Sequence, residues 1–139
     1  LCMYLLALGT TAIAAAFDLK SRRIPNLIPF ALLSCALALS AAGLHPLGWR
    51  QAVLGVLVAA ALTVPLFARG WFGGGDAKLC IALGATLGLQ PFLVFFVITC
   101  VVGGVFALRA LRLGQAEIAY APVMLVGLLL LIPLGWLSQ

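Results

Sequence analysis

Long apolar runs alternate along the whole chain with short breaks that are polar or contain glycine and proline. A helix needs about 20 apolar residues to cross the hydrocarbon core of a bilayer, so each run is a candidate membrane span. The pattern predicts six such helices, at residues 1–17, 27–43, 52–68, 77–89, 92–111 and 118–137. Because no long linker divides them, we expect one domain over residues 1–139, an all-α polytopic membrane helical bundle.

The fourth predicted span is the shortest of the six. Residues 77–89 would rise only about 20 Å as an α-helix, which is less than the thickness of the hydrocarbon core. If it did not cross, Arg109 and Arg112 would lie on the outer side and the asymmetry of positive charge would be lost, so we keep it as a short span. A short helix preceded by glycine is also typical of backbone that enters a membrane to line a polar cavity. Elsewhere, Pro65 predicts a kink inside the third span, and Gly88 with Pro91 predicts the break before the fifth.

Positive charges orient the predicted bundle, because loops on the cytoplasmic side of a membrane protein collect lysine and arginine. If the first loop is cytoplasmic, only Arg50 of the basic residues falls outside. The residues that fall inside are Lys20, Arg22, Arg23, Arg69, Lys78, Arg109 and Arg112. This division gives three cytoplasmic loops and places both termini on the periplasmic side.

The composition is that of a membrane chain and excludes a soluble fold. Hydrophobic residues make up 65% of the sequence and charged residues 8%, and the mean hydropathy is +1.28. The net charge of +5 is the sum of membrane-flanking basic residues with few acids, so it indicates no nucleic-acid partner. The first run lacks the preceding basic residues of a cleavable signal, and we expect it to remain as a helix.

The cysteines give no sign of a metal site. Cys2, Cys35, Cys80 and Cys100 lie far apart, inside or beside the apolar runs, and form no CxxC pair. Only one histidine, His45, accompanies them. This spacing argues against a zinc site and against a disulfide framework, so we expect packing roles for the thiols and neither metal nor cofactor.

The carboxylates are the most informative polar residues, because the whole chain holds only Asp18, Asp76 and Glu117. Asp18 ends the first predicted span and Asp76 stands at the start of the fourth, so both are expected at the cytoplasmic membrane surface. Ionisable side chains at this depth cost free energy unless they pair with another group, are hydrated or serve a function. Two carboxylates that share a proton can hydrolyse a peptide bond, one activating water while the other donates a proton. The alternative is that each pairs with adjacent basic residues and only stabilises a loop end.

Three glycines, Gly73, Gly74 and Gly75, directly precede Asp76. Glycine adopts backbone conformations closed to other residues and lets a second chain or a substrate approach closely, although such a run can also be a flexible loop. Lys78 follows in the same motif, where it could shape a site or lower the charge cost of an acid pair. A lysine at a cytoplasmic helix end is equally typical of an orientation anchor, so both roles stay open.

Three segments together resemble the type IV prepilin peptidases, a family of membrane aspartic peptidases with a GxGD motif. They are DLKSRRIPN at residues 18–26, GGGDAKL at 73–79 and IAYAP at 118–122. The likeness extends over nearly the whole chain and is greatest to the short members that serve tight-adherence (Flp) pili. GGGD is similar to the GxGD signature, which implies Asp76 as one catalytic acid, and the acid leading into RRIPN implies Asp18 as the other.

The resemblance implies an endopeptidase of the bacterial inner membrane that cleaves the N-terminal leader of prepilins or pseudopilins on the cytoplasmic side. The positive charges indicate the same side. Longer members of the family also methylate the new pilin N-terminus and carry a cysteine-rich cytoplasmic insert. The first loop here is short and holds no CxxC, so we expect the peptidase without the methyltransferase. The expected partners are a prepilin or pseudopilin leader and the lipid bilayer.

Two other mechanisms agree less well with the sequence. A small proton-coupled transporter could use the two aspartates as a relay, but it predicts an acid near the middle of the bilayer. A serine mechanism has little support, because no serine has a GxSxG-like setting and His45 lies on the predicted far side. Glu117 is expected to favour the N-terminus of the last helix rather than to take part in catalysis.

Overall fold

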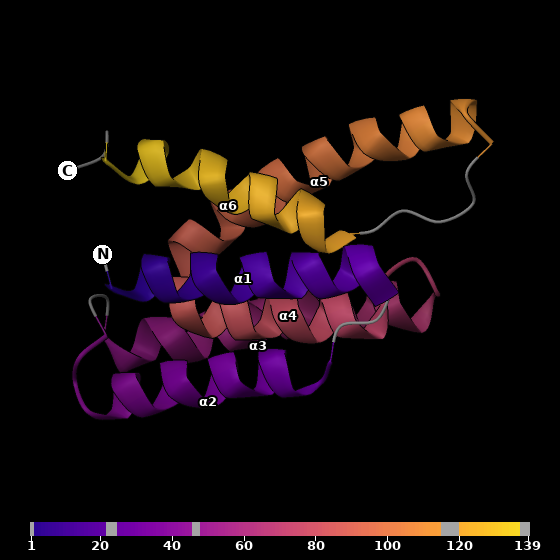
Figure 1. Cartoon of the computed structure of the whole chain (residues 1–139). Helices are drawn as coiled ribbons and strands as arrows, with labels where there is room; N and C mark the ends of the chain where they lie inside the picture. Colours follow the sequence, from indigo (N-terminus) through magenta and orange to yellow (C-terminus); the bar gives the residue numbers. More distant parts are fainter. Residues whose placement is uncertain (1, 22–24, 46–47, 115–119, 137–139) are drawn as a thin grey trace.

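The computed structural model describes residues 2–21, 25–45, 48–114 and 120–136, which contain six α-helices (Figure 1). The helices are α1 (Cys2–Ser21), α2 (Leu27–Ala41), α3 (Trp49–Ala68), α4 (Gly74–Leu87), α5 (Leu89–Arg112) and α6 (Tyr120–Trp136). The predicted all-α class and number of helices are confirmed. Arg22, Arg23 and Glu117 lie outside the described residues.

Successive helices run in alternating directions, so their ends gather at two opposite faces of the bundle (Figure 1). The end of α1 and the starts of α4 and α6 lie at one face, whereas the start of α1 and the end of α6 lie at the other. Helix α1 packs against both α4 and α6. The segments that carry the two aspartates therefore meet at the same face of the bundle as the start of α6.

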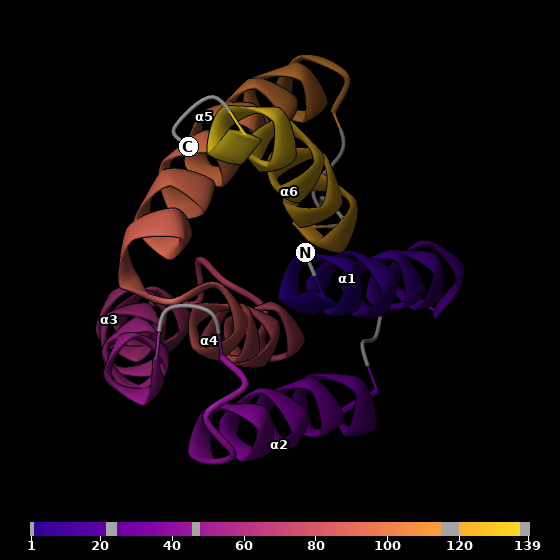
Figure 2. The same cartoon turned by 90° about the vertical axis from the view of Figure 1, so that its left-hand side faces the viewer.

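The shortest helix, α4, forms the centre of the bundle. It packs against α1, α2, α3 and α5, and Figure 2 shows it between α1 and α3 with α2 beside them. Every residue from 82 to 88 is buried. Because many residues of α4 are glycine or alanine, neighbouring helices can approach it closely on several sides.

Helices α3 and α4 approach backbone to backbone at Gly55 and Gly84. A Cβ built on either glycine would collide with the carbonyl group of the other. A Cβ on Gly84 would also lie 2.8 Å from the Cβ of Ala59. Contacts between small residues are how helices associate in a membrane, where van der Waals packing replaces the burial of apolar surface from water.

We expect Gly84→Leu to force α3 away from α4 and destabilise the bundle. No side chain fits between the two backbones, so the loss should reach the upper end of the range of about 1–3 kcal/mol that is typical of overpacking. Thermal unfolding of the purified protein in detergent measures the effect. Gly9→Leu is the matched control, because a Cβ at Gly9 on α1 meets nothing within 4 Å. Equal unfolding temperatures for the two variants would contradict the role of this contact.

Two helix boundaries differ from the prediction at the aspartates. Helix α1 continues past its apolar run to Ser21, so Asp18 lies within the last turn instead of at the helix end. Ser21 Oγ donates a hydrogen bond to the carbonyl oxygen of Phe17 at 2.9 Å in that turn. Helix α4 begins at Gly74, so Asp76 lies in its first turn. The apolar pattern marks where hydrophobic residues stop, whereas the backbone bonding of a helix continues through polar residues.

The break between α4 and α5 is confirmed at Gly88. This glycine has a φ of 79° and is the single residue between the two helices. Helix α5 nevertheless begins at Leu89, three residues before the predicted start, and Pro91 lies within its first turn. Proline is tolerated there because the first N–H groups of a helix have no acceptor within the helix.

Two of the described helices are long and apolar enough to cross a membrane. They are α3 and α5, with mean hydropathies of 2.1 and 2.5. Helix α2 and the part of α6 from Tyr120 to Leu131 are apolar but shorter. The count of six membrane spans, and the side on which the termini lie, stay predictions.

Candidate active site

Asp18 lies on α1 against the start of α6 and is buried, with 8% of its surface exposed. Its Oδ2 accepts a hydrogen bond from the backbone N–H of Ala121 at 3.2 Å. The first N–H groups of a helix have no acceptor within the helix, and the positive end of the helix dipole lies there. The start of helix α6 therefore holds the Asp18 carboxyl group in place.

Asp76 is the third residue of α4, which begins at Gly74 after the cap residue Gly73. Its Oδ1 is buried and has no hydrogen-bond partner among the described residues. Its Oδ2 fills the space beside Gly73. A Cβ atom built on Gly73 would lie only 2.7 Å from this oxygen. A buried polar atom without a partner is costly and uncommon in folded proteins, so this carboxyl is a candidate for binding or chemistry.

The two carboxyl groups interact although they are far apart in the sequence. Burial raises the pKa of Asp76, and the nearby negative charge of Asp18 raises it further, to about 7. Asp76 directly precedes the predicted span at residues 77–89, so it lies at the edge of the apolar region. A carboxyl that keeps its proton near neutrality beside a charged carboxylate is the arrangement that acid/base hydrolysis requires.

The other residues of the glycine motif shape the start of α4. Gly74 faces the ring of Phe67, and a Cβ built on Gly74 would lie 3.2 Å from Phe67 Cε2. Gly75 is the next residue in the first turn of α4. Lys78 Nζ donates a hydrogen bond to Asn26 Oδ1 at 3.0 Å in an exposed position. Lys78 thus ties α4 to the residue before α2.

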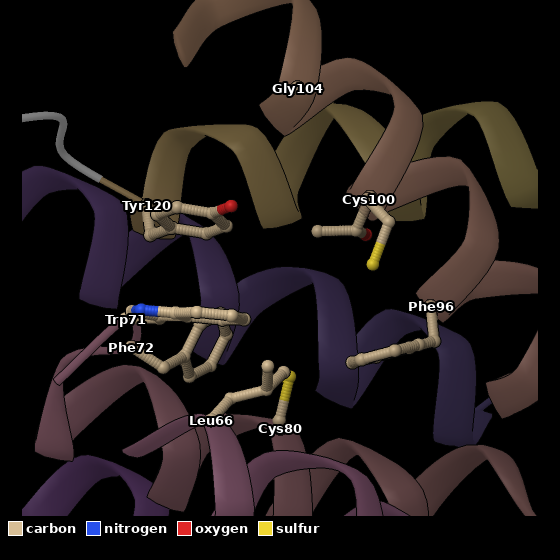
Figure 3. Close-up of a pocket in the computed structure, with 9 residues that line it drawn as sticks. Leu66, Trp71, Phe72, Cys80, Phe96, Cys100, Gly104 and Tyr120 are labelled. Carbon is tan, nitrogen blue, oxygen red and sulfur yellow. The ribbon is translucent and has the colours of Figure 1, made fainter. Parts of the chain in front are cut away.

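A pocket of about 230 Å³ opens between α3, α4, α5 and the start of α6 (Figure 3). The side chains that form its walls include Trp71, Phe72, Cys80, Phe96, Cys100 and Tyr120. Cys80 and Tyr120 both lie within electrostatic reach of Asp76. The pocket therefore lies near the Asp76 carboxyl group, and its walls are mainly apolar.

Tyr120 forms one wall of the pocket and is held on two sides. Its ring packs edge to face against Phe72, with the ring centroids 5.0 Å apart. Its hydroxyl lies over Gly103 on α5, where a Cβ would come within 3.0 Å of the oxygen. These contacts fix the ring at the start of α6, next to the N–H that binds Asp18.

His45 lies away from the aspartates, as predicted. Its Nε2 is 3.2 Å from the carbonyl oxygen of Thr86, near the far end of α4. Thr86 follows Asp76 by ten residues on the same helix, which corresponds to about 15 Å along its axis. Within the described stretches of the chain, no three His, Cys, Asp or Glu side chains converge on a point that could hold a metal ion.

The family model of the type IV leader peptidases matches residues 5–108. That stretch is most of the chain, and it contains both aspartates and the glycine motif. The chain belongs to the type IV leader peptidase family. No curated protein and no solved structure gives a match.

A type IV leader peptidase is a hydrolase that processes prepilins, so the predicted family and enzyme class are confirmed. The match ends within α5. The segment at residues 118–122, which also carried the resemblance, lies outside it. The hydrogen bond from Ala121 to Asp18 links the start of α6 to the candidate site.

Two parts of the candidate site were not predicted from the sequence, the N–H of Ala121 and the pocket beside Tyr120. Pro122 was a usable signal, because proline favours the first turn of a helix and so marks a helix start. A helix start supplies free N–H groups that bind anions. The sequence does not indicate which carboxylate the N–H groups at the start of α6 bind.

Gly73→Ala is expected to lower leader cleavage about 10²-fold while the fold is retained, because the new methyl group displaces the Asp76 carboxyl. Gly73 has a φ of −67°, which alanine also adopts, so the substitution tests the space and not the backbone. The measurement is kcat/KM with a purified prepilin, together with circular dichroism. Gly9→Ala serves as the control, since its Cβ meets nothing within 4 Å. Unchanged cleavage by Gly73→Ala would show that the position of this carboxyl is unimportant.

Proposed function

We propose that the protein is a membrane aspartic endopeptidase of the bacterial inner membrane. It cleaves the N-terminal leader of Flp-like prepilins or pseudopilins at the cytoplasmic face, with Asp18 and Asp76 activating water. The observation that carries the proposal is the electrostatic pairing of the two carboxyl groups, one from the last turn of α1 and one from the first turn of α4. Membership of the leader peptidase family supports it.

The different surroundings of the two aspartates support different roles. Asp18 accepts a hydrogen bond from the backbone N–H of Ala121, which holds its carboxyl group in a fixed position, as a general base requires. Asp76 keeps its proton to about pH 7 because burial and the charge of Asp18 both raise its pKa, which suits a general acid. These surroundings support Asp18 as the base and Asp76 as the acid.

The reaction follows from these roles without a covalent intermediate. Asp18 takes a proton from a water molecule as the water oxygen attacks the carbonyl carbon of the leader peptide bond. Asp76 donates its proton to the carbonyl oxygen as the tetrahedral intermediate forms. The intermediate then collapses: Asp18 passes its proton to the leaving amine, and Asp76 recovers a proton from a hydroxyl of the intermediate.

The outer face of α5 supports a membrane location. Val97, Val101, Val105 and Leu108 follow one another at three- and four-residue spacing, and each is more than half exposed. Soluble monomers rarely expose a contiguous apolar surface of this kind. A bilayer would cover it, and the hydropathy of α3 and α5 is sufficient for spanning helices.

The cytoplasmic orientation is supported by where helices begin and end. The end of α1, the start of α4 and the start of α6 share one face of the bundle (Figure 1). Basic residues in or beside the helix ends of that face are Lys20, Arg69, Lys78, Arg109 and Arg112, whereas Arg50 lies in the first turn of α3. Positive charges favour the cytoplasmic side, so the aspartates would open to the cytoplasm.

Cleavage of a purified Flp-type prepilin in detergent, in the presence of a chelator, tests the proposal. We expect chelator-resistant release of the leader, because the two carboxyl groups suffice for the chemistry. Cleavage that the chelator abolishes would contradict an aspartate mechanism. If no prepilin or pseudopilin is cleaved, proton flux in liposomes becomes the decisive assay, and flux that depends on both aspartates would replace the peptidase by a transporter.

A further inference from the structure

Asn26 and Lys78 join the two segments of the chain that carry the aspartates. Asn26 ends the segment DLKSRRIPN, which begins at Asp18, and Lys78 follows Asp76 by two residues in the segment GGGDAKL. The hydrogen bond from Lys78 Nζ to Asn26 Oδ1, at 3.0 Å, connects residues that are 52 positions apart in the sequence. This bond therefore links the chain that follows the first aspartate to the helix that carries the second.

The side chain of Asn26 does not stabilise its own helix. Asparagine is one of the preferred residues at a helix N-cap, because its side-chain oxygen can accept a backbone N–H of the first turn. Asn26 is the N-cap of α2, yet its side chain makes no such bond. Its Oδ1 accepts the hydrogen bond from Lys78 instead. The side chain thus serves the contact with α4 rather than the start of α2.

Lys78 and Asp76 lie on opposite sides of α4. Residues two apart on an α-helix are turned by about 200° from each other. Helix α4 packs against both α1 and α2 (Figure 2). Asp76 interacts with Asp18 of α1, whereas Lys78 bonds the residue before α2. A rotation of α4 that carried Asp76 away from Asp18 would therefore break the bond at Lys78.

The first turn of α4 is weak on its own. It follows the cap residue Gly73, which has no side chain to bond the turn, and it begins with Gly74 and Gly75. Glycine loses more backbone freedom on folding than any other residue, so a turn that begins with glycines unwinds easily. Asp76 lies in this turn, and Lys78 is the next polar residue of the helix. The bond at Lys78 anchors the helix just beyond the turn that carries Asp76.

We propose that Asn26 and Lys78 are a pair of positioning residues that hold the start of α4 in the rotation that places Asp76 against Asp18. The inference rests on the proposed peptidase function and adds how the two carboxyl groups are kept together. The pair acts through Asp76 and transfers no proton itself. A catalytic group displaced by about 1 Å can slow a reaction about 10²-fold, so a single exposed bond can affect the rate far more than the stability.

The kinetics of prepilin cleavage test the pair. We expect Lys78→Met and Asn26→Ala each to lower kcat about 10–100-fold with KM little changed, and the double variant to be no slower than the slower single variant. Asn26→Asp still accepts the bond from Lys78, so we expect it to retain most of kcat. Lys20→Met is the matched control, because Lys20 is an exposed lysine in the last turn of α1.

Titration of Asp76 separates positioning from a direct effect of the lysine charge. If Lys78→Met lets Asp76 move away from Asp18, the pKa of Asp76 falls, because the neighbouring negative charge is more distant. Loss of a nearby positive charge would instead raise this pKa. Asn26→Ala removes no charge, and we expect it to lower the pKa of Asp76 in the same way. The ¹³C NMR signals of the aspartate carboxyl carbons measure both variants.

The outcomes separate this proposal from the proposed function. Unchanged kcat in Lys78→Met and Asn26→Ala, an equal loss in Lys20→Met, or an equal loss in Asn26→Asp and Asn26→Ala would overturn the pair. A pKa of Asp76 that rises in Lys78→Met and does not change in Asn26→Ala would also overturn it. Failure of the wild type to cleave any prepilin would instead overturn the peptidase, and the titration would still test the pair because it needs no substrate.

Discussion

Replacement of either Asp18 or Asp76 by asparagine is expected to lower leader cleavage by at least about 10⁴-fold. Asparagine keeps the shape of the side chain but neither accepts a proton from water nor donates one to a carbonyl oxygen. Because the two carboxyl groups act as one unit, we expect the double variant to be no slower than either single variant. Single-turnover cleavage of a purified prepilin measures all three.

The third carboxylate provides the matched control for these variants. Glu117→Gln also removes one acid, and we expect it to retain most of the cleavage rate. Cleavage that survives in either aspartate variant would overturn the pair, and equal loss in Glu117→Gln would point to net charge rather than to a specific site.

A stability measurement shows whether the lost activity comes from unfolding. The pKa of Asp76 is raised from 3.8 to about 7 in the folded protein, so folding favours its protonated form. Stability from this group is fully present below about pH 4 and is lost as pH rises towards 7. Asparagine cannot ionise, so Asp76→Asn should unfold at the same or a higher temperature than wild type at pH 8. A clearly lower temperature would mean that the variant is inactive because it is damaged.

The cleavage rate is expected to fall about tenfold per pH unit above about pH 7, because the general acid Asp76 then loses its proton. Burial is the main reason for the high pKa, and the negative charge of Asp18 is the second. The measurement is kcat/KM between pH 6 and 9, with a substrate that has no group titrating in this range.

Gly73→Ala provides a comparison for the pH profile. If its methyl group pushes the Asp76 carboxyl towards solvent, burial decreases and the alkaline limb should move to lower pH. A wild-type rate that stays constant to pH 9 would show that the proton on Asp76 is not used. A profile in Gly73→Ala identical to that of wild type would show that the substitution leaves the surroundings of the carboxyl unchanged.

The helices could be predicted from the sequence because apolar runs and breaks are strong signals in this chain. Gly88 was identified as a break, and it is the single residue between α4 and α5. The ends near the aspartates were less accurate, because Asp18 and Asp76 are polar residues within helices rather than outside them. The central position of α4 was not predicted, since its close contact at Gly55 and Gly84 depends on how two backbones meet in space.

The candidate site was predictable as two acids at one face, but not as a geometry. The equal depth of Asp18 and Asp76 followed from the order of the predicted spans. The importance of the glycine motif followed from its resemblance to the GxGD signature of a known family. The hydrogen bond from Ala121 was not predictable, because it comes from the backbone and any residue can supply it. The pocket was hidden for a similar reason, since Cys80, Phe96 and Tyr120 are ordinary apolar residues of three different helices.

The pairing of the two aspartates can be tested directly by ¹³C NMR, because Asp18 and Asp76 are the only aspartates in the chain. Protein labelled at the aspartate carboxyl carbon gives two signals, and the signal missing in Asp76→Asn is that of Asp76. We predict that Asp76 titrates near pH 7 in wild type, and that Asp18→Asn lowers its pKa because the neighbouring negative charge is gone. An Asp76 signal that titrates in the ordinary range of a carboxyl, unchanged by Asp18→Asn, would contradict a paired catalytic site.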